Sequence, residues 1–247
     1  MKYIHIYIFI FFNILLSENQ GVIKEMDSMI STYEYKNAAS IGEDWLKNNP
    51  EDVEVIWRLA QCNFYIGQQS EDIKIHKKYY YPALEYARKA LELNPKSARA
   101  NHWYAVLIGQ TGIIEGTEQK IINSYESKKY ADIAISLDPN YDGTYHVLGR
   151  WNFELADLSW IERSIASWVY ATPPQGSFEE AVEFFKKAVE TKDDEIRHYV
   201  WLGNSYFELG DYQNARTSWE DAFKLEPKSE LDELLIKEAK NNLAKLK

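Results

Sequence analysis

Apolar and small residues recur along this chain at the spacing of paired amphipathic helices, and the pattern is clearest near the C-terminus. In residues 199–227, "YVWLGNSYFELGDYQNARTSWEDAFKLEP", one helix is predicted before Gly210 and a second one after it. Small residues such as Gly203 and Ala215 stand where two helices must approach closely, and large residues fill the space between turns. Pro227 closes the unit. The pattern predicts a repeated helix pair.

The same arrangement can be traced back along the chain. Alanine-rich second helices stand at "YPALEYARKALELNP", "KYADIAISLDP" and "SFEEAVEFFKKAVE", and their first helices are predicted at residues 53–65, 98–109 and 142–155. A weaker unit, "YEYKNAASIGEDWLKNNP", precedes them. The order W-x2-L-G-x2-Y, then A-x3-F, then a late proline is that of tetratricopeptide repeats. We therefore expect an all-α tetratricopeptide-repeat helical solenoid of about four to five repeats.

The chain ends in "SELDELLIKEAKNNLAKLK", in which Ser229 and Asp232 form a capping box ahead of an amphipathic stripe. A solenoid exposes the apolar face of its last repeat unless a terminal element covers it. This segment is therefore predicted to be a C-terminal capping helix.

The spacing between repeats is irregular. Ala188 and Ala222 are 34 residues apart, but Ala90 and Ala134 are 44 apart, and Ala134 and Ala188 are 54 apart. The middle repeats are thus predicted to carry helical insertions between helix A and helix B. The longest insertion, residues 157–176, has apolar residues on one helical face and ends at a double proline, which predicts an extra helix packed on the solenoid. Whether it fills part of the concave groove is left open by the sequence.

The first 20 residues differ from the rest of the chain. They combine Lys2 with an apolar run that has the length of a signal-peptide core and is too short to span a bilayer. We expect a signal peptide at residues 1–20, a tetratricopeptide-repeat domain at residues 21–247, and an exported protein, periplasmic or extracellular, with no integral membrane segment after signal removal. The alternative is membrane association through an uncleaved N-terminal segment.

Charge and composition exclude several classes of function. The net charge of -10 argues against nucleic acid as a partner. The single cysteine, Cys62, allows neither an internal disulfide nor a cysteine-based zinc site. No H-E-x-x-H, G-x-S-x-G or glycine-rich phosphate loop is present. We therefore expect a protein that is not an enzyme and needs no cofactor or metal.

The repeat register does predict a binding surface, because helix A of each repeat lines the concave face of such a solenoid. Arginines on this face suit carboxylates, and aromatic side chains suit a peptide, so we expect a groove for a protein or peptide with an acidic group or a free C-terminus. The predicted groove residues are Trp57, Gln61, Arg99, His102, His146, Arg150, Arg197 and Asn204. The alternative is structural: the arginines pair with Glu54, Glu154 and Glu208, and the tryptophans are core.

Several segments resemble a known family. The segments "VIWRLAQ", "ALEYARKALELNP", "ANHWYAVLIGQTGIIEG" and "HVLGRWNFELADLSWIERSIASWVYATPPQGSFEEAVEFFKKA" are similar to the tetratricopeptide domain of the regulator of microtubule dynamics proteins, with the same split repeats. The resemblance implies an interaction domain, here in an exported, bacterial-type member. Two functions follow: a non-catalytic adaptor or scaffold that binds a partner through its concave face, or a microtubule- or organelle-associated regulator of that family's type.

Overall fold

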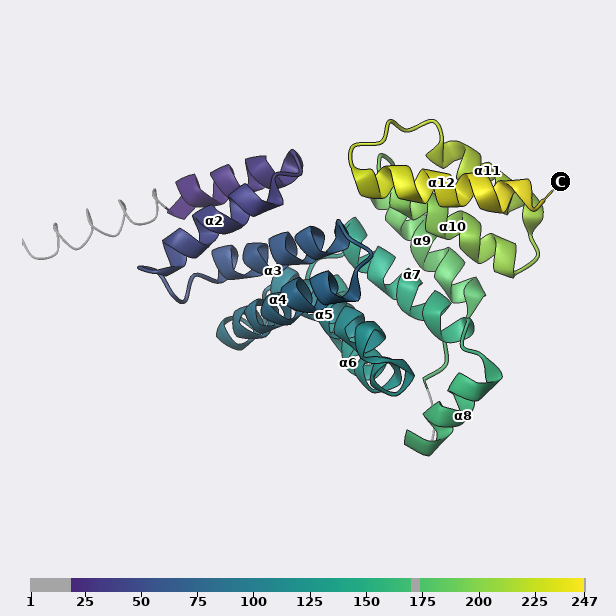
Figure 1. Cartoon of the computed structure of the whole chain (residues 1–247), viewed down its shortest axis with the longest axis horizontal. Coiled ribbons are helices and arrows are strands. Elements are labelled where there is room, and N and C mark those ends of the chain that lie inside the picture. Colours follow the sequence, from purple (N-terminus) through teal and green to yellow (C-terminus); the bar gives the residue numbers. More distant parts are fainter. Residues whose placement is uncertain (1–18, 170–173, 247) are drawn as a thin grey trace, which may run out of the picture.

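The computed structural model describes residues 19–169 and 174–246, and within these residues every regular element is a helix (Figure 1). Residues 19–31 form a helix that precedes α2. The other helices are α2 (Tyr35–Leu46), α3 (Val53–Gln68), α4 (Ile73–Leu93), α5 (Ala98–Glu115), α6 (Thr117–Leu137), α7 (Asp142–Ala156), α8 (Trp160–Val169), α9 (Phe178–Thr191), α10 (Ile196–Glu208), α11 (Tyr212–Ala222) and α12 (Glu230–Ala244). The prediction of an all-α solenoid is confirmed. The predicted signal peptide lies almost entirely outside the described residues.

The helices pack as successive pairs: residues 19–31 with α2, α3 with α4, α5 with α6, α7 with α9, and α10 with α11. Helix starts are fixed by capping side chains, since Asp52, Ser97 and Ser177 each accept a hydrogen bond from a backbone N–H of the first turn. The first helices of the middle repeats begin at the predicted residues. The described residues thus form five helix pairs, as the repeat pattern predicted.

Close packing inside a pair depends on a small residue facing a large ring. Gly203 of α10 lies against the indole of Trp219 of α11, which is fully buried, and Gly149 of α7 lies against the buried ring of Phe185 of α9. A side chain at position 149 would place its Cβ 2.7 Å from the Phe185 ring, so only glycine allows this approach. These contacts explain why the pattern of small and large residues predicts the pairing so well.

Two shorter insertions, which the spacing predicts near residues 68–80 and at residues 111–124, are not separate elements. The residues assigned to them extend α4, α5 and α6, which have 21, 18 and 21 residues, whereas α10 and α11 of the regular repeat have 13 and 11. The extra residues therefore become additional helical turns in the second and third helix pairs. Because the expected spacing between repeats is constant, these additional turns resemble inserted segments in the sequence.

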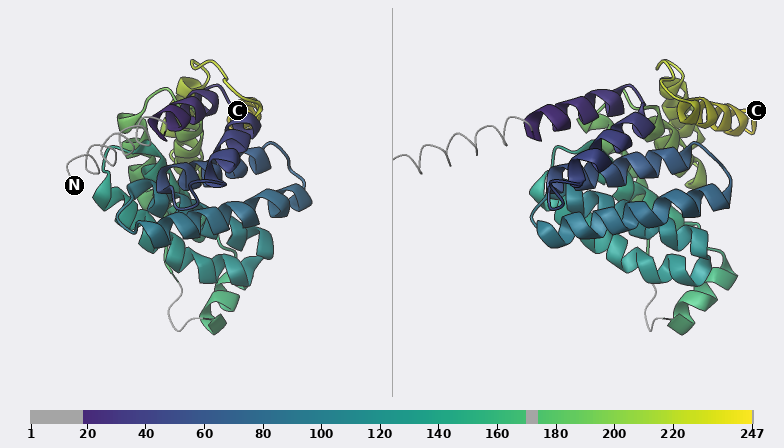
Figure 2. Two further views of the ribbon diagram at one scale, coloured as in Figure 1. Left: turned by 90° about the vertical axis from the view of Figure 1, so that its left-hand side faces the viewer. Right: turned by 60° about the vertical axis from the view of Figure 1, so that its left-hand side comes forward.

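The third insertion does contain a new helix, α8, which contacts α6. In both views of Figure 2, α8 lies at the opposite end of the molecule from residues 19–31 and from α12. Leu158 is buried, but Trp160 and Ile161 are 80% and 64% exposed, so the predicted apolar face is only partly covered. Of the insertion residues whose side chains the structure describes, 157–164 and 174–176, none lines the two cavities of the concave face.

The C-terminal helix α12 packs on α10 and α11 and buries Ala239 against the last repeat. It begins at Ser229, whose hydroxyl accepts from the backbone N–H of Asp232, as the capping box predicted. The predicted capping helix is confirmed. None of the helices that the structure describes is both long enough and apolar enough to cross a membrane.

Candidate functional site

The concave face of the solenoid is hollowed into two cavities that share part of their walls. The smaller has a volume of about 340 Å³ and the larger about 590 Å³. The residues that line both are Tyr65, Gln68, Tyr141, Arg197, Leu231 and Leu235. Because the two cavities share these lining residues, they adjoin, and together they are called the groove below.

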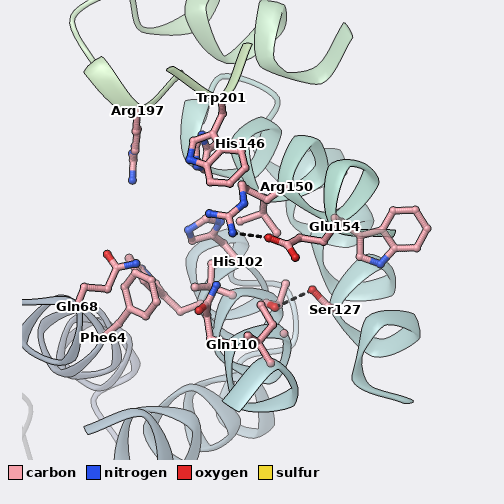
Figure 3. Close-up of a pocket in the computed structure, with 18 of the residues that line it drawn as sticks. Phe64, Gln68, His102, Gln110, Ser127, His146, Arg150, Glu154, Arg197 and Trp201 are labelled. Carbon is pink, nitrogen blue, oxygen red and sulfur yellow. Dashed lines mark hydrogen bonds and ion pairs between the residues drawn. The ribbon is translucent and has the colours of Figure 1, made fainter. Parts of the chain in front are cut away.

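The smaller cavity lies at the centre of the groove and is walled by α3, α5, α6, α7, α10 and α12 (Figure 3). Much of its wall is aromatic or aliphatic: Phe64, Tyr65, Trp103, Val106, Ile113, Tyr141, Val147, Trp151, Trp201 and Leu235. Apolar walls with a few convergent polar groups are typical of ligand sites, and its volume lies at the lower end of the usual range.

Three cations and one carboxylate also line this cavity. Glu154 accepts from Arg150 at 2.7 Å and from Lys120 at 2.9 Å, so one carboxylate serves two cations. Burial raises the pKa of Glu154, but Arg150 and Lys120 outweigh burial and leave that pKa below its ordinary value. With Arg197 as the third cation, the lining carries an excess of positive charge within a protein of net charge -10.

Arg197 crosses from the last repeat into the groove. Its guanidinium donates to the hydroxyl of Tyr65 at 3.1 Å and to the carboxylate of Asp142 at 3.4 Å, and it lies 3.5 Å from the carboxylate of Glu195. The guanidinium of Arg150 stacks over the ring of Trp201, 3.7 Å from its centroid. Arg150 and Arg197 both reach into the cavity in Figure 3, on the side opposite Phe64 and Gln68.

A chain of three polar side chains, the buried Asp142 and His198 and the half-buried His146, approaches the same cavity. The carboxylate of Asp142 lies 2.9 Å from Nε2 of His198, and Nδ1 of His198 lies 3.1 Å from Nδ1 of His146, which lines the cavity. Burial lowers the pKa of both histidines, so both rings are neutral near pH 7. Burial also lowers the pKa of His102, to about 3, with Arg99 and Arg197 acting in the same direction.

The structure brings five of the eight predicted groove residues to the groove. His102, His146 and Arg150 line the smaller cavity, Gln61 lines the larger one, and Arg197 lines both. Their common signal in the sequence was the helix A register.

The other three predicted residues, Trp57, Arg99 and Asn204, line neither cavity. Trp57 is 7% exposed and packs in the core of the first full repeat. Arg99 stacks on Tyr141, 3.3 Å from the ring centroid. Asn204 accepts from Nε1 of Trp219 and donates to Glu238 of α12, so it joins the last three helices. The structural alternative thus describes Trp57, which is core, whereas Arg99 pairs with Asp138 and not with any of the three glutamates it named.

Several other residues that line the smaller cavity were not predicted from the helix A register. Lys120 comes from α6, a second helix, and Leu231 and Leu235 come from the capping helix, so none of them belongs to the helix A positions that were considered. Glu154 was predicted only as an arginine partner in the structural alternative, and it does pair with Arg150, which stands four residues earlier on the same helical face. The long-range contacts of Lys120 and Leu231 had no signal in the sequence.

The site offers binding groups and no arrangement with an evident reaction. Among the described residues, no group of three or more His, Cys, Asp or Glu side chains could hold a metal ion. The thiol of Cys62 is buried away from the groove, and burial raises its pKa to about 12. The groups that converge on the smaller cavity are cations, the carboxylate of Glu154, neutral imidazoles and aromatic rings.

Solved structures with a similar fold are tetratricopeptide-repeat proteins. A thermophilic TPR protein of Thermus thermophilus superposes with a TM-score of 0.67 over 92% of this chain and 99% of its own, at 17% identity. Pseudomonas aeruginosa PilF superposes with a TM-score of 0.56 over 92% of this chain and 87% of its own, at 14% identity. At these identities the likeness shows the fold alone, and it confirms the predicted repeat class.

Sequence comparison identifies closer relatives. Regulator of microtubule dynamics protein 1 of Bos taurus is 38% identical over 161 residues, which are 64% of this chain and 51% of that protein. Regulator of microtubule dynamics protein 3 of Xenopus laevis is 33% identical over 163 residues, 66% of this chain and 35% of that protein. The chain therefore spans about half the length, or less, of these relatives.

These relatives correct one expectation from the sequence. They are animal proteins named for an effect on microtubules, which are structures of the cell interior, and this contradicts the expectation of an exported, periplasmic or extracellular protein. The apolar start of the chain has the composition of a signal peptide, but composition alone cannot distinguish an export signal from other apolar segments.

The family that matches is described as "Regulator of microtubule dynamics protein 1-3", and the match covers residues 22–247, nearly the whole chain. The resemblance noted in the split repeats is thereby confirmed, and the chain belongs to the regulator of microtubule dynamics protein family.

Proposed function

We propose that this protein is a non-catalytic scaffold that binds an extended segment of a partner protein along its concave groove. The observation that carries the proposal is the continuous pair of cavities, in which Arg150 and Arg197 stand among aromatic walls. Repeat solenoids use such concave surfaces for binding. The excess positive charge of the smaller cavity favours a segment that carries a carboxylate.

The larger cavity supports an extended ligand over a compact one. It is lined by Ile30 and Tyr33 from the first helix pair, by Gln61 from α3, and by Lys228 and Asp232 from the start of the last helix. A segment lying there would contact both ends of the solenoid and continue into the smaller cavity. The mixture of amide, hydroxyl and charged groups along this path suits a peptide backbone.

The test is affinity capture with matched double variants of the full chain. Arg150→Gln with Arg197→Gln removes both groove arginines, and Arg88→Gln with Arg216→Gln makes the same change at two positions that line neither cavity. We expect the groove variant to lose its partners, by about tenfold or more in affinity, since hydrogen bonds to charged groups contribute about 1.5–3 kcal/mol. The control should retain them.

Circular dichroism must show that both double variants keep the helical content of the wild type, because Arg150 also holds Glu154. A groove variant that is folded and captures the same partners as the wild type would refute the proposal. Photo-crosslinking from position 61 or 68 gives a second readout that leaves the arginines in place, and it should mark the same partners.

A second candidate function rests on the family. The relatives are named regulators of microtubule dynamics, so direct binding to microtubules is the specific form of scaffold that membership favours. The measurement is co-sedimentation of the full chain with assembled microtubules, with the two double variants in parallel. Loss of binding in the groove variant alone would assign microtubule binding to the groove, and binding retained by both variants would place it elsewhere on the molecule.

A further inference from the structure

Unpartnered hydrogen-bond donors gather around the smaller cavity. Among the described residues, six buried side-chain nitrogen or oxygen atoms have no hydrogen-bond partner, and three of them belong to residues that line this cavity. The three are Nε1 of Trp103, Nε of Arg150 and Nε of Arg197. All three are donors. Trp103 is only 2% exposed, and Nε of Arg197 lies 3.5 Å from the carboxylate of Glu195 without forming a hydrogen bond to it. A buried donor without an acceptor costs about 1–3 kcal/mol, so the cavity is suited to a ligand rich in acceptor atoms.

The charges of the lining point to the same kind of ligand. Glu154 is shared by Arg150 and Lys120, whereas Arg197 faces two carboxylates, those of Asp142 and Glu195. Arg150 and Lys120 therefore have one carboxylate between them, and one further carboxylate from a ligand would balance this pair. Arg150 and Arg197 present planar guanidinium groups, which suit a carboxylate better than a lysine does.

The contacts that run from Asp142 through His198 to His146 supply a hydrogen-bond acceptor of fixed orientation beside these donors. The ionised carboxylate of Asp142 can only accept, so Nε2 of His198 carries the hydrogen of their 2.9 Å contact. Neutral His198 then has a lone pair on Nδ1, and Nδ1 of His146 must donate across the 3.1 Å contact. Neutral His146 is left with a lone pair on Nε2. Through His198, the carboxylate of Asp142 thus fixes which ring nitrogen of His146 carries the hydrogen.

A group with a carboxylate and a nearby N–H donor matches this lining. The last residue of a polypeptide is such a group, because its carboxylate and its amide N–H are attached to the same carbon. The apolar walls formed by residues such as Phe64, Val106 and Trp201 then suit the side chain of that residue. The volume of about 340 Å³ fits the end of a chain, and the preceding residues have room in the adjoining 590 Å³.

We propose that the smaller cavity binds the C-terminal residue of the partner, with its carboxylate between Arg150 and Arg197, its amide N–H donating to Nε2 of His146, and an apolar side chain against the aromatic wall. This inference rests on the proposed function, since it assigns the end of the segment that occupies the groove. An internal acidic residue differs from a C-terminus in having chain on both sides, and the experiment separates the two.

The probes are four pools of fluorescein-labelled hexapeptides. Three of them are random at the first four positions, with Ala at position five and Phe or Leu at position six. The first pool has a free C-terminal carboxylate, the second has a C-terminal amide, and the third has the free carboxylate but an N-methyl group on the last peptide nitrogen. A fourth pool places Glu at position three and ends in an amide. Retention on the immobilised full chain is measured by fluorescence.

We expect retention of the free-acid pool to exceed that of the amide pool by about tenfold or more, and the N-methyl pool to be weakened as well, since each change removes at least one charge-assisted or buried hydrogen bond. Arg150→Gln and Arg197→Gln should each reduce the preference for the free acid, and Arg88→Gln should leave it unchanged. Because the first comparison uses the unaltered protein, a variant that fails to fold does not affect the result.

Equal retention of the free-acid and amide pools would overturn the assignment of a C-terminus, and retention of the internal-Glu pool in that case would leave the scaffold function intact. Undiminished retention of the N-methyl pool would overturn the role of His146. Failure of all four pools to bind would overturn both this inference and the peptide groove on which it rests.

Discussion

The neutral imidazole of His102 makes the stability of this protein depend on pH, and the size of the effect can be worked from the structure. The ring is 3% exposed, lies edge-on to Trp103 and Tyr141, and has Nδ1 3.2 Å from the hydroxyl of Thr144. Burial, reinforced by the positive charges of Arg99 and Arg197, lowers its pKa from 6.5 to about 3, against the opposing effect of Asp142.

The sign follows from proton binding in the two states. Below pH 6.5 the unfolded chain protonates this histidine and the folded protein does not, so the free energy of unfolding falls as the pH falls from 6.5 towards 3. Each pH unit in this window is worth about 1.4 kcal/mol, so His102 alone removes about 2 kcal/mol of stability between pH 7 and pH 5. His146 and His198, whose pKa values are also lowered, act in the same direction.

The assay is urea unfolding followed by circular dichroism at pH 7, 6 and 5 for the wild type, His102→Gln and His76→Gln. His102→Gln removes the titrating ring, so its loss of stability between pH 7 and pH 5 should be smaller than that of the wild type by about 2 kcal/mol. His76→Gln makes the same chemical change outside both cavities, and the comparison isolates the buried ring. If His102→Gln loses as much stability as the wild type over this range, the reasoning is refuted.

Two further predictions concern packing and reactivity. Gly203→Ala should destabilise the last helix pair by about 1–3 kcal/mol in urea unfolding, because the added Cβ would stand 2.5 Å from Cδ1 of the buried Trp219 ring. Gly21→Ala, in a helix with nothing within 4 Å, should instead stabilise by up to about 1 kcal/mol, and a loss of stability there equal to that of Gly203→Ala would contradict the packing argument. The thiol of Cys62, fully buried and with its pKa raised to about 12, should react with a thiol-specific chromogenic reagent only in denaturant. Rapid labelling of Cys62 in the native protein would instead show that α3, which carries it, unfolds locally without denaturant.

The repeat pairing could be predicted because it is encoded locally. Small residues such as Gly149, and caps such as Ser177, occur at fixed offsets within one helix pair, so a single repeat contains the information for its own geometry. The long helices α4 and α6 were not predicted as such, since extra helical turns preserve the amphipathic pattern and leave no boundary signal. The sequence predicted that these helices exist, and only their lengths had to be taken from the structure.

The candidate site was predictable only in part, because it is assembled from distant repeats. The helix A register indicates that Arg150 and Arg197 face inward, but it contains no information about what lies across the groove. The contact between Arg197 and Tyr65 joins residues 132 positions apart and depends on the accumulated curvature of the intervening helices. Arg99 illustrates the same limit, since its ring contact with Tyr141 is a property of the neighbouring repeat and not of its own helix.

The larger cavity has walls at both ends of the chain, with Tyr33 on one side and Lys228 and Asp232 on the other. The distance between these walls therefore depends on the small rotations at the interfaces between successive helix pairs, which add up along the solenoid. Substitutions deep in any of those interfaces would alter the fit of a ligand without touching a single lining residue. Selection on the packing between helix pairs therefore also acts on which ligands fit the groove, so ligand affinity and core packing evolve together.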